Sequence, residues 1–142
     1  MYYHEEKMNL LNVPQGYFIA HCISGDFTLG AGVAKQIDEA FGMKNMLRMM
    51  WGNDGMSDEY WCAPCGNVLN LITKRRYYQK PTLDSLREAL EDMRKLVDEE
   101  GIKKIAMPKI GCGLDRLNWD DVSPMIQEIF DDADVEIMVC YL

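Results

Sequence analysis

Lys74 stands where a lysine side chain can serve as a nucleophile. It follows the apolar run 67–73, which has the composition of a buried strand. A lysine just past the end of such a strand is partly removed from water, and desolvation favours the neutral amine that attacks sugar and carbonyl carbons. Because Arg75 and Arg76 come next, a solvated run of charges is the alternative, and spacing alone leaves both interpretations open.

Two glycine-rich segments follow two further strand-like runs. The segment 24–32 holds a Gly-Ala-Gly triplet before a helical pattern, and the segment 108–116 holds a Gly-Cys-Gly triplet ahead of Asp115. Glycines let the backbone approach a ligand closely, and the free N–H groups at a helix start suit a diphosphate. The first segment has Lys35 in place of the third Rossmann glycine, and it is not a Walker loop. Each segment alone can be a plain strand-to-helix turn, but the pair favours two loops that clamp a diphosphate.

The five cysteines favour reduced thiols over a metal or disulfide framework. Their odd number, their scatter and an N-terminus without a secretion-like pattern predict a cytoplasmic protein. Cys62 and Cys65 form a Cys-x-x-Cys motif, but a zinc site needs two more ligands, and neither His4 nor His21 has matching spacing. We expect ordinary strand or loop cysteines, with a redox pair as the alternative, and no metal or other cofactor.

Length and charge limit the classes of function. The 142 residues fit one domain, expected to span residues 1–142, and no apolar run reaches the length of about 18 residues that a membrane helix needs. We therefore expect no membrane partner. The net charge of −8 disfavours a general nucleic-acid binder, although it leaves action at a polynucleotide end open. An anionic ligand would have to be held by local backbone N–H groups.

Strand-like and helix-like runs alternate along the chain. Strands are predicted over 17–23, 67–73, 102–107 and 135–141, and helices over 31–41, 45–51, 82–100 and 118–130. The alternation predicts an α/β sandwich with a mixed or largely parallel sheet. Ligands of such folds bind beyond the carboxyl ends of the strands, where Lys74 and both glycine segments would lie.

These motifs together resemble the macrodomain family. The matching segments are His21-Cys22-Ile23-Ser24, Gly30-Ala31-Gly32, Leu71-Ile72-Thr73-Lys74, Lys80-Pro81-Thr82 and Met107-Pro108-Lys109-Ile110-Gly111-Cys112-Gly113-Leu114-Asp115-Arg116-Leu117. They are most similar to the terminal ADP-ribose glycohydrolase subgroup, and the resemblance runs from about Lys7 to Leu142. It implies a three-layer α/β/α sandwich with a mixed, largely parallel central sheet. It also implies ADP-ribose as the ligand, and a catalytic lysine and aspartate that match Lys74 and Asp115.

The glycine segments and the resemblance together define the expected site. The ligand-binding residues are expected to be Asn9, Leu10, His21, Ser24, Gly30, Gly32, Val33, Thr73, Pro108, Ile110, Gly111, Cys112, Gly113, Leu114 and Leu142. Two positions depart from many macrodomains. The segment 20–24 lacks an asparagine, an absence that the lysine-using subgroup shares. Asn9 replaces a common aspartate that accepts a hydrogen bond from the adenine amine, and its neutral amide should accept more weakly.

The resemblance further implies a reaction. ADP-ribose would be ester-linked through C1″ to glutamate or aspartate of a modified protein, with Lys74 attacking the distal ribose and Asp115 serving as acid and base. Alternatives on the same pocket are deacetylation of O-acetyl-ADP-ribose, hydrolysis of ADP-ribose 1″-phosphate, removal of ADP-ribose from a DNA base, and binding without cleavage. The charge disfavours the DNA substrate, and the presence of both catalytic residues disfavours a pure reader. The expected partners are ADP-ribose and ADP-ribosylated proteins. We also expect a monomer, because many macrodomains of this length are monomers.

Overall fold

A six-stranded sheet forms the central layer of the structure, a computed structural model that describes residues 1–142. The strands are β1 (Tyr2–Lys7), β2 (Phe18–Ser24), β3 (Cys62–Cys65), β4 (Val68–Lys74), β5 (Lys104–Met107) and β6 (Glu136–Tyr141). They stand in the order β1-β6-β5-β2-β4-β3. All neighbouring pairs are parallel except β3 and β4, which are antiparallel. The carboxyl ends of the five parallel strands therefore meet at one edge of the sheet.

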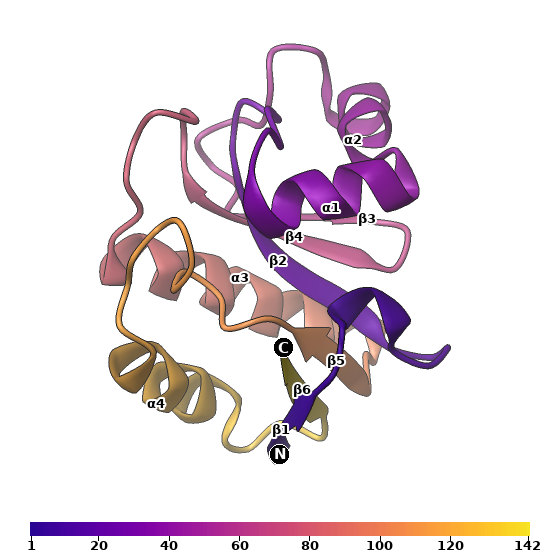
Figure 1. The fold of residues 1–142 in the computed structure, drawn as a ribbon, viewed down its shortest axis with the longest axis vertical. Helices are drawn as coiled ribbons and strands as arrows, with labels where there is room; N and C mark the ends of the chain where they lie inside the picture. The colour runs from indigo at the N-terminus through magenta and orange to yellow at the C-terminus, as the bar shows by residue number, and fades with distance from the viewer.

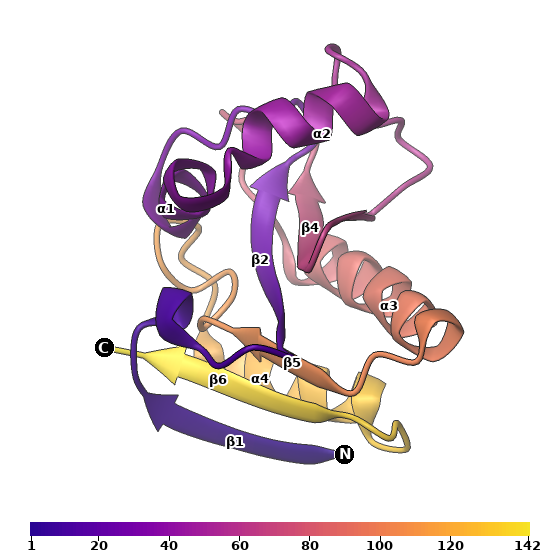
Figure 2. The same cartoon turned by 90° about the vertical axis from the view of Figure 1, so that its right-hand side faces the viewer.

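Helices cover both faces of this sheet. They are the 3₁₀ helix η1 (Leu10–Asn12) and the α-helices α1 (Gly32–Phe41), α2 (Met43–Trp51), α3 (Leu83–Glu100) and α4 (Trp119–Phe130). Figures 1 and 2 show α1 and α2 on one side of the sheet and α3 and α4 on the other. In β2, Ile19 and Ile23 pack with Ile37 of α1 and Leu47 of α2, whereas Ala20 belongs to the core beneath α3 and α4. The predicted three-layer sandwich with a mixed, largely parallel sheet is confirmed.

The longest helix, α3, begins and ends at the expected signals. The Thr82 hydroxyl accepts a hydrogen bond from the Ser85 N–H, and the Ser85 hydroxyl accepts one from the Thr82 N–H, which forms a capping box. Gly101 ends the helix with a φ of 66°. None of the helices combines the length and the apolar character that a membrane span requires.

The sequence patterns missed the two strands at the edges of the sheet. The polar run of β1, Tyr-Tyr-His-Glu-Glu-Lys, remains partly or fully exposed because only β6 pairs with this strand. The short β3 has four residues and contains Pro64, which an edge strand tolerates because one row of its N–H groups needs no partner. Neither strand shows the regular burial pattern from which strands are usually recognised.

Cys62 and Cys65 are strand cysteines, as expected. Residues that are three positions apart in a strand point to opposite faces of the sheet. Cys62 lies in the core with α3 and α4, and Cys65 lies in the core with α1 and α2. Because the sheet separates the two buried thiols, they can neither form a disulfide with one another nor share a metal ion.

Candidate active site

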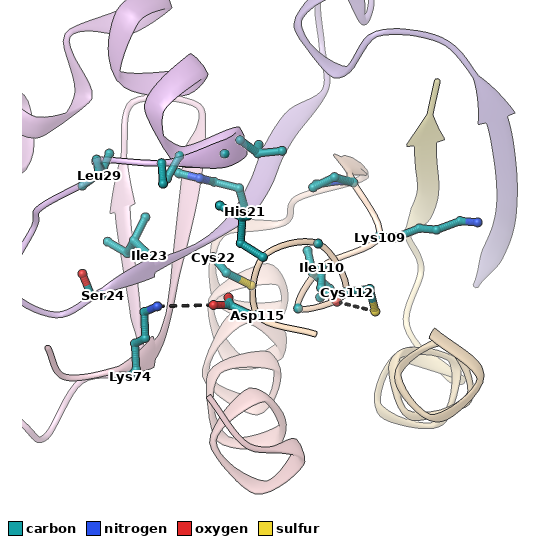
Figure 3. Close-up of a pocket in the computed structure, with 18 of the residues that line it drawn as sticks. His21, Cys22, Ile23, Ser24, Leu29, Lys74, Lys109, Ile110, Cys112 and Asp115 are labelled. Carbon is teal, nitrogen blue, oxygen red and sulfur yellow. Dashed lines mark hydrogen bonds and ion pairs between the residues drawn. The ribbon is translucent and has the colours of Figure 1, made fainter. Parts of the chain in front are cut away.

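A cavity of about 890 Å³ lies along the carboxyl edge of the sheet. Its walls come from the ends of β2 and β6, from both glycine segments, and from Lys74 and Tyr77 at and after the end of β4. Figure 3 shows lining residues that converge on this space from β2, β4 and the loop after β5. The volume lies within the range of roughly 300–1,000 Å³ that is typical of small-molecule sites.

Lys74 and Asp115 meet inside this cavity. Lys74 is the last residue of β4, and Asp115 lies in the loop between β5 and α4. The Lys74 Nζ donates to the Asp115 Oδ1 at 3.3 Å, and the two side chains are only 18% and 21% exposed. Figure 3 shows them pointing toward one another. A partly buried amine beside a carboxylate suits nucleophilic attack, because the carboxylate can take the proton of the amine and return it later.

His21 lies in the cavity wall as a buried, neutral ring. Its Nε2 lies 2.6 Å from the Oδ1 of Asn70. The Asn70 Nδ2 donates to the carbonyl of Ala63, so Oδ1 is the atom that faces His21, and Nε2 must carry the proton. Burial lowers the pKa of His21 to about 4, which keeps the ring neutral at physiological pH. His21 therefore ties β2 to β4 as a neutral core residue.

The cysteines of the cavity are protonated thiols. Burial raises the pKa of Cys22 to about 12, and burial also raises the pKa of Cys112 and of Cys140. The Cys112 Sγ donates to the carbonyl of Ile110. A thiolate is the reactive form of cysteine, and these surroundings suppress it. The cavity thiols are therefore poor candidates for nucleophiles.

The first glycine segment presents backbone N–H groups to the cavity. Helix α1 begins at Gly32, and its N-cap residue Ala31 provides no side-chain hydrogen bond to the helix. The wall of the cavity runs through this start, from Thr28 to Ala34. The unpaired N–H groups at a helix start favour an anion. A Cβ at Gly32 would lie 3.2 Å from the Leu114 Cδ1 of the second glycine segment, so glycine permits the two segments to approach.

Strained backbone is concentrated in the same two segments. Phe27, Leu29 and Arg116 are the only non-glycine residues with positive φ, at 57°, 43° and 62°. This conformation is unfavourable for residues with a Cβ and persists only where the surroundings impose it. Phe27 and Leu29 are fully buried, so the core holds this loop in its conformation.

The two glycines of the second segment have different roles. Gly111 has a φ of 74°, and a Cβ there would lie 2.9 Å from the Leu117 Cδ1. The Leu117 N–H also donates to the Gly111 carbonyl at 2.7 Å, which closes the loop. Gly113 has ordinary φ and no atom within 4 Å of a Cβ position. Gly111 is thus needed for the turn, whereas Gly113, which belongs to the cavity lining, has room for a side chain.

Asp26, which no sequence motif indicated, joins the first glycine segment to the loop after β4. Its Oδ1 accepts from the Ser24 hydroxyl at 2.5 Å and from the N–H and hydroxyl of Thr28 at 3.3 and 2.9 Å. Its Oδ2 accepts from the Tyr77 N–H at 2.9 Å. Burial alone would raise the pKa of Asp26, but these hydrogen bonds outweigh it and lower the pKa. One carboxylate therefore positions three residues of the cavity wall.

The structure brings most of the predicted site residues to the cavity. Its lining includes Lys74, Asp115, His21, Ser24, Gly30, Gly32, Val33, Pro108, Ile110, Gly111, Cys112, Gly113 and Leu114. The other four predicted residues, Asn9, Leu10, Thr73 and Leu142, lie outside this lining. Leu10 and Thr73 are buried, whereas Leu142 is exposed. The Asn9 Oδ1 accepts from the Leu11 N–H at 2.9 Å and caps η1.

Other residues of the lining were not predicted. They are Cys22, Ile23, Thr28, Leu29, Ala31, Ala34, Tyr77, Lys109, Cys140 and Tyr141. Most of them lie within or beside the recognised motifs. Cys140 and Tyr141 end a predicted strand, so the rule that placed Lys74 at the carboxyl edge could have found them. Tyr77 belongs to no motif, and its place depends on the contact between its N–H and Asp26.

Comparison with known sequences gives two findings. The sequence model of the family described as Macro domain matches residues 62–126. A human protein named ADP-ribose glycohydrolase OARD1 is 37% identical to this chain over 139 residues, which cover 94% of this chain and 87% of the human protein. The match therefore spans both glycine segments and both residues of the ion pair.

Solved structures extend the likeness over the whole fold. The macrodomain of Thermus aquaticus DarG matches with a TM-score of 0.82 at 23% identity, covering 99% of this chain and 98% of that chain. Thermosipho africanus DarTG, solved in complex with ADP-ribose, matches with a TM-score of 0.65 at 16% identity. That match covers 86% of this chain and 37% of the other. At these identities the likeness establishes a shared fold.

Proposed function

The chain belongs to the macrodomain family, and we propose that it is an ADP-ribose hydrolase that releases ADP-ribose from esters with glutamate or aspartate of modified proteins. The observation that carries the proposal is the Lys74–Asp115 pair, 3.3 Å apart in the wall of a cavity large enough for a nucleotide. Identity of 37% to a human protein named an ADP-ribose glycohydrolase supports the hydrolytic activity.

The chemistry of the cavity wall suits ADP-ribose. The diphosphate would lie between the N-terminus of α1 and the second glycine segment, where unpaired N–H groups can compensate its charge in a chain of net charge −8. The distal ribose would then lie at the β4 end beside Lys74, and the adenosine would extend toward Tyr141 at the β6 end.

The proposed reaction begins at C1″ of the distal ribose. Asp115 accepts a proton from the Lys74 ammonium, and the neutral amine attacks C1″. The bond between C1″ and the ester oxygen breaks, and its electron pair leaves with the acceptor carboxylate. The ribose is then joined to the Lys74 Nζ by a C–N bond, and the nitrogen passes its extra proton to the departing carboxylate, which leaves as the carboxylic acid.

The second half of the reaction releases the sugar. Asp115 returns its proton to the ring oxygen, which opens the ribose and leaves a protonated imine between the Lys74 nitrogen and C1″. Water adds to C1″, the C–N bond breaks, and the lysine amine takes up a proton. The net reaction consumes one water and gives ADP-ribose and the free acceptor carboxylic acid.

Incubation of the protein with an ADP-ribosylated glutamyl peptide tests this proposal. We expect equal amounts of free ADP-ribose and unmodified peptide, identified by mass. Competition by O-acetyl-ADP-ribose and by an ADP-ribosylated oligonucleotide ranks the substrates by their specificity constants. Tight binding of ADP-ribose without cleavage of any of the three would make the protein a reader and refute the proposal.

The adenine end can be tested separately with Asn9→Asp. An aspartate can still cap η1, and a charged acceptor makes a stronger hydrogen bond to the adenine amine than an amide does. ADP-ribose affinity, measured by calorimetry, should therefore be unchanged or improved at an unchanged melting temperature. A loss of about tenfold or more, about 1.4 kcal/mol, would contradict a role of residue 9 as acceptor for the adenine amine.

A further inference from the structure

The position of the catalytic pair decides on which side of the cavity the modified protein must lie. The cavity crosses β6, β5, β2 and β4, a path of about 14 Å at a strand spacing of about 4.8 Å. Lys74 lies at the β4 end of this path. No strand pairs with Lys74 on its outer side, because β3 begins opposite Leu71. The loop of residues 57–61 lies beside the end of β4 instead, and its carbonyls accept hydrogen bonds from the Arg75 guanidinium. With C1″ at Lys74 and adenosine toward β6, the group attached to C1″ leaves the cavity beyond β4.

Tyr77 lies at this exit. It lines the cavity together with Lys74, yet 63% of the residue is exposed. Its ring meets the ring of Tyr78 edge-on, with the centroids 5.5 Å apart. The structure thus places a largely exposed aromatic residue in the cavity wall, three positions after the proposed nucleophile.

Hydrogen bonds within the protein hold the backbone that carries Tyr77. The N–H groups of Arg75 and Arg76 donate to the Gln79 Oε1 at 3.1 and 2.9 Å. The Tyr77 N–H donates to the Asp26 Oδ2 at 2.9 Å. Three consecutive N–H groups are therefore held by side chains. Such preorganisation removes much of the ordering cost that an exposed loop otherwise adds to binding.

We propose that Tyr77 is a specificity-determining residue, whose ring packs against the amino acid that carries the ADP-ribose. The inference rests on the proposed function, because it requires C1″ to lie beside Lys74. A tyrosine ring provides a large contact area with few rotatable bonds to order. The contact exists with the conjugate and is lost when the acceptor departs. Tyr77 therefore favours the ADP-ribosylated protein over the free ADP-ribose product.

Binding to a conjugate that is not consumed tests this inference. Free ADP-ribose and an ADP-ribosylated glutamyl peptide are titrated into Lys74→Ala and into Lys74→Ala/Tyr77→Ala. The second change should weaken peptide-conjugate binding about tenfold, which corresponds to about 1.4 kcal/mol. It should alter the affinity for free ADP-ribose by less than about twofold, because the nucleotide does not reach the ring. Tyr77→Phe in the same background keeps the ring and should keep the affinity for the conjugate.

Tyr2→Ala is the matched control, because Tyr2 is also 63% exposed and lies on the edge strand β1, outside the cavity lining. This change should affect neither ligand. An equal loss for both ligands upon Tyr77→Ala, or no loss for the conjugate, would overturn the inference. Since binding is measured, failure of the wild-type protein to hydrolyse the conjugate would refute the proposed function and still leave the Tyr77 result readable.

Discussion

Lys74→Ala should abolish release of ADP-ribose from a glutamyl peptide while the protein still binds free ADP-ribose. The side chain supplies the proposed nucleophile, and no cavity thiol can replace it, because burial raises the pKa of Cys22, Cys112 and Cys140. We expect a loss of at least about a hundredfold in turnover, roughly 2.7 kcal/mol of transition-state stabilisation. Calorimetry should give an ADP-ribose affinity within about threefold of wild type.

Lys74→Arg separates nucleophilicity from charge. The guanidinium preserves a cation beside Asp115 but stays protonated and cannot attack C1″. This variant should therefore be nearly as inactive as Lys74→Ala. If either variant retained more than about a tenth of the wild-type rate, the loss would be under about 1.4 kcal/mol, too small for a nucleophile. The activity would then have to come from direct attack by water.

Gly113→Glu is expected to have the largest effect on binding. Gly113 belongs to the cavity lining, and nothing lies within 4 Å of a Cβ there, so the backbone accepts a side chain at the cavity wall. A glutamate would fill the space beside the proposed diphosphate and add a like charge. ADP-ribose should then raise the melting temperature of the wild-type protein but not that of the variant.

Gly113→Gln is the control for the charge, because the amide has the same size as the carboxylate. We expect it to weaken binding by filling space, but less than the glutamate does. An equal thermal shift by ADP-ribose in the wild-type protein and in Gly113→Glu would contradict the placement of the diphosphate between the two glycine segments. The melting temperatures without ligand show whether both variants are folded.

The meeting of Lys74 and Asp115 could be predicted because both residues lie where local patterns end. Lys74 ends an apolar strand and Asp115 follows the glycines after another, and parallel strands bring such positions to one edge. The α/β sandwich followed from the alternation of strands and helices, and its three layers were implied by the resemblance to macrodomains. The edge strand β1 was missed because its polar side chains stay accessible, so burial leaves no periodic pattern in its sequence.

The remaining parts of the site depend on contacts that no local pattern encodes. Asp26 looks like a residue of an ordinary turn, and its role appears only when the Ser24 hydroxyl and the Tyr77 N–H converge on its carboxylate. The amide of Asn9 was expected to face adenine, but it caps η1 and lies outside the cavity lining, so its role as a ligand stays a prediction. The contact between Asp26 and Tyr77 joins segments distant in sequence, whereas the Asn9 cap is local to η1.

Intact-mass measurement of Asp115→Ala after incubation with an ADP-ribosylated glutamyl peptide tests the central claim most directly. Without the carboxylate, the adduct between Lys74 and the ribose should form slowly and resolve more slowly still, because its breakdown lacks the acid–base group. The account predicts a protein mass increased by one ADP-ribosyl group, carried by a peptide that contains Lys74 and absent from Asp115→Ala/Lys74→Arg. Unchanged mass in an Asp115→Ala protein that still releases ADP-ribose would contradict covalent catalysis by Lys74.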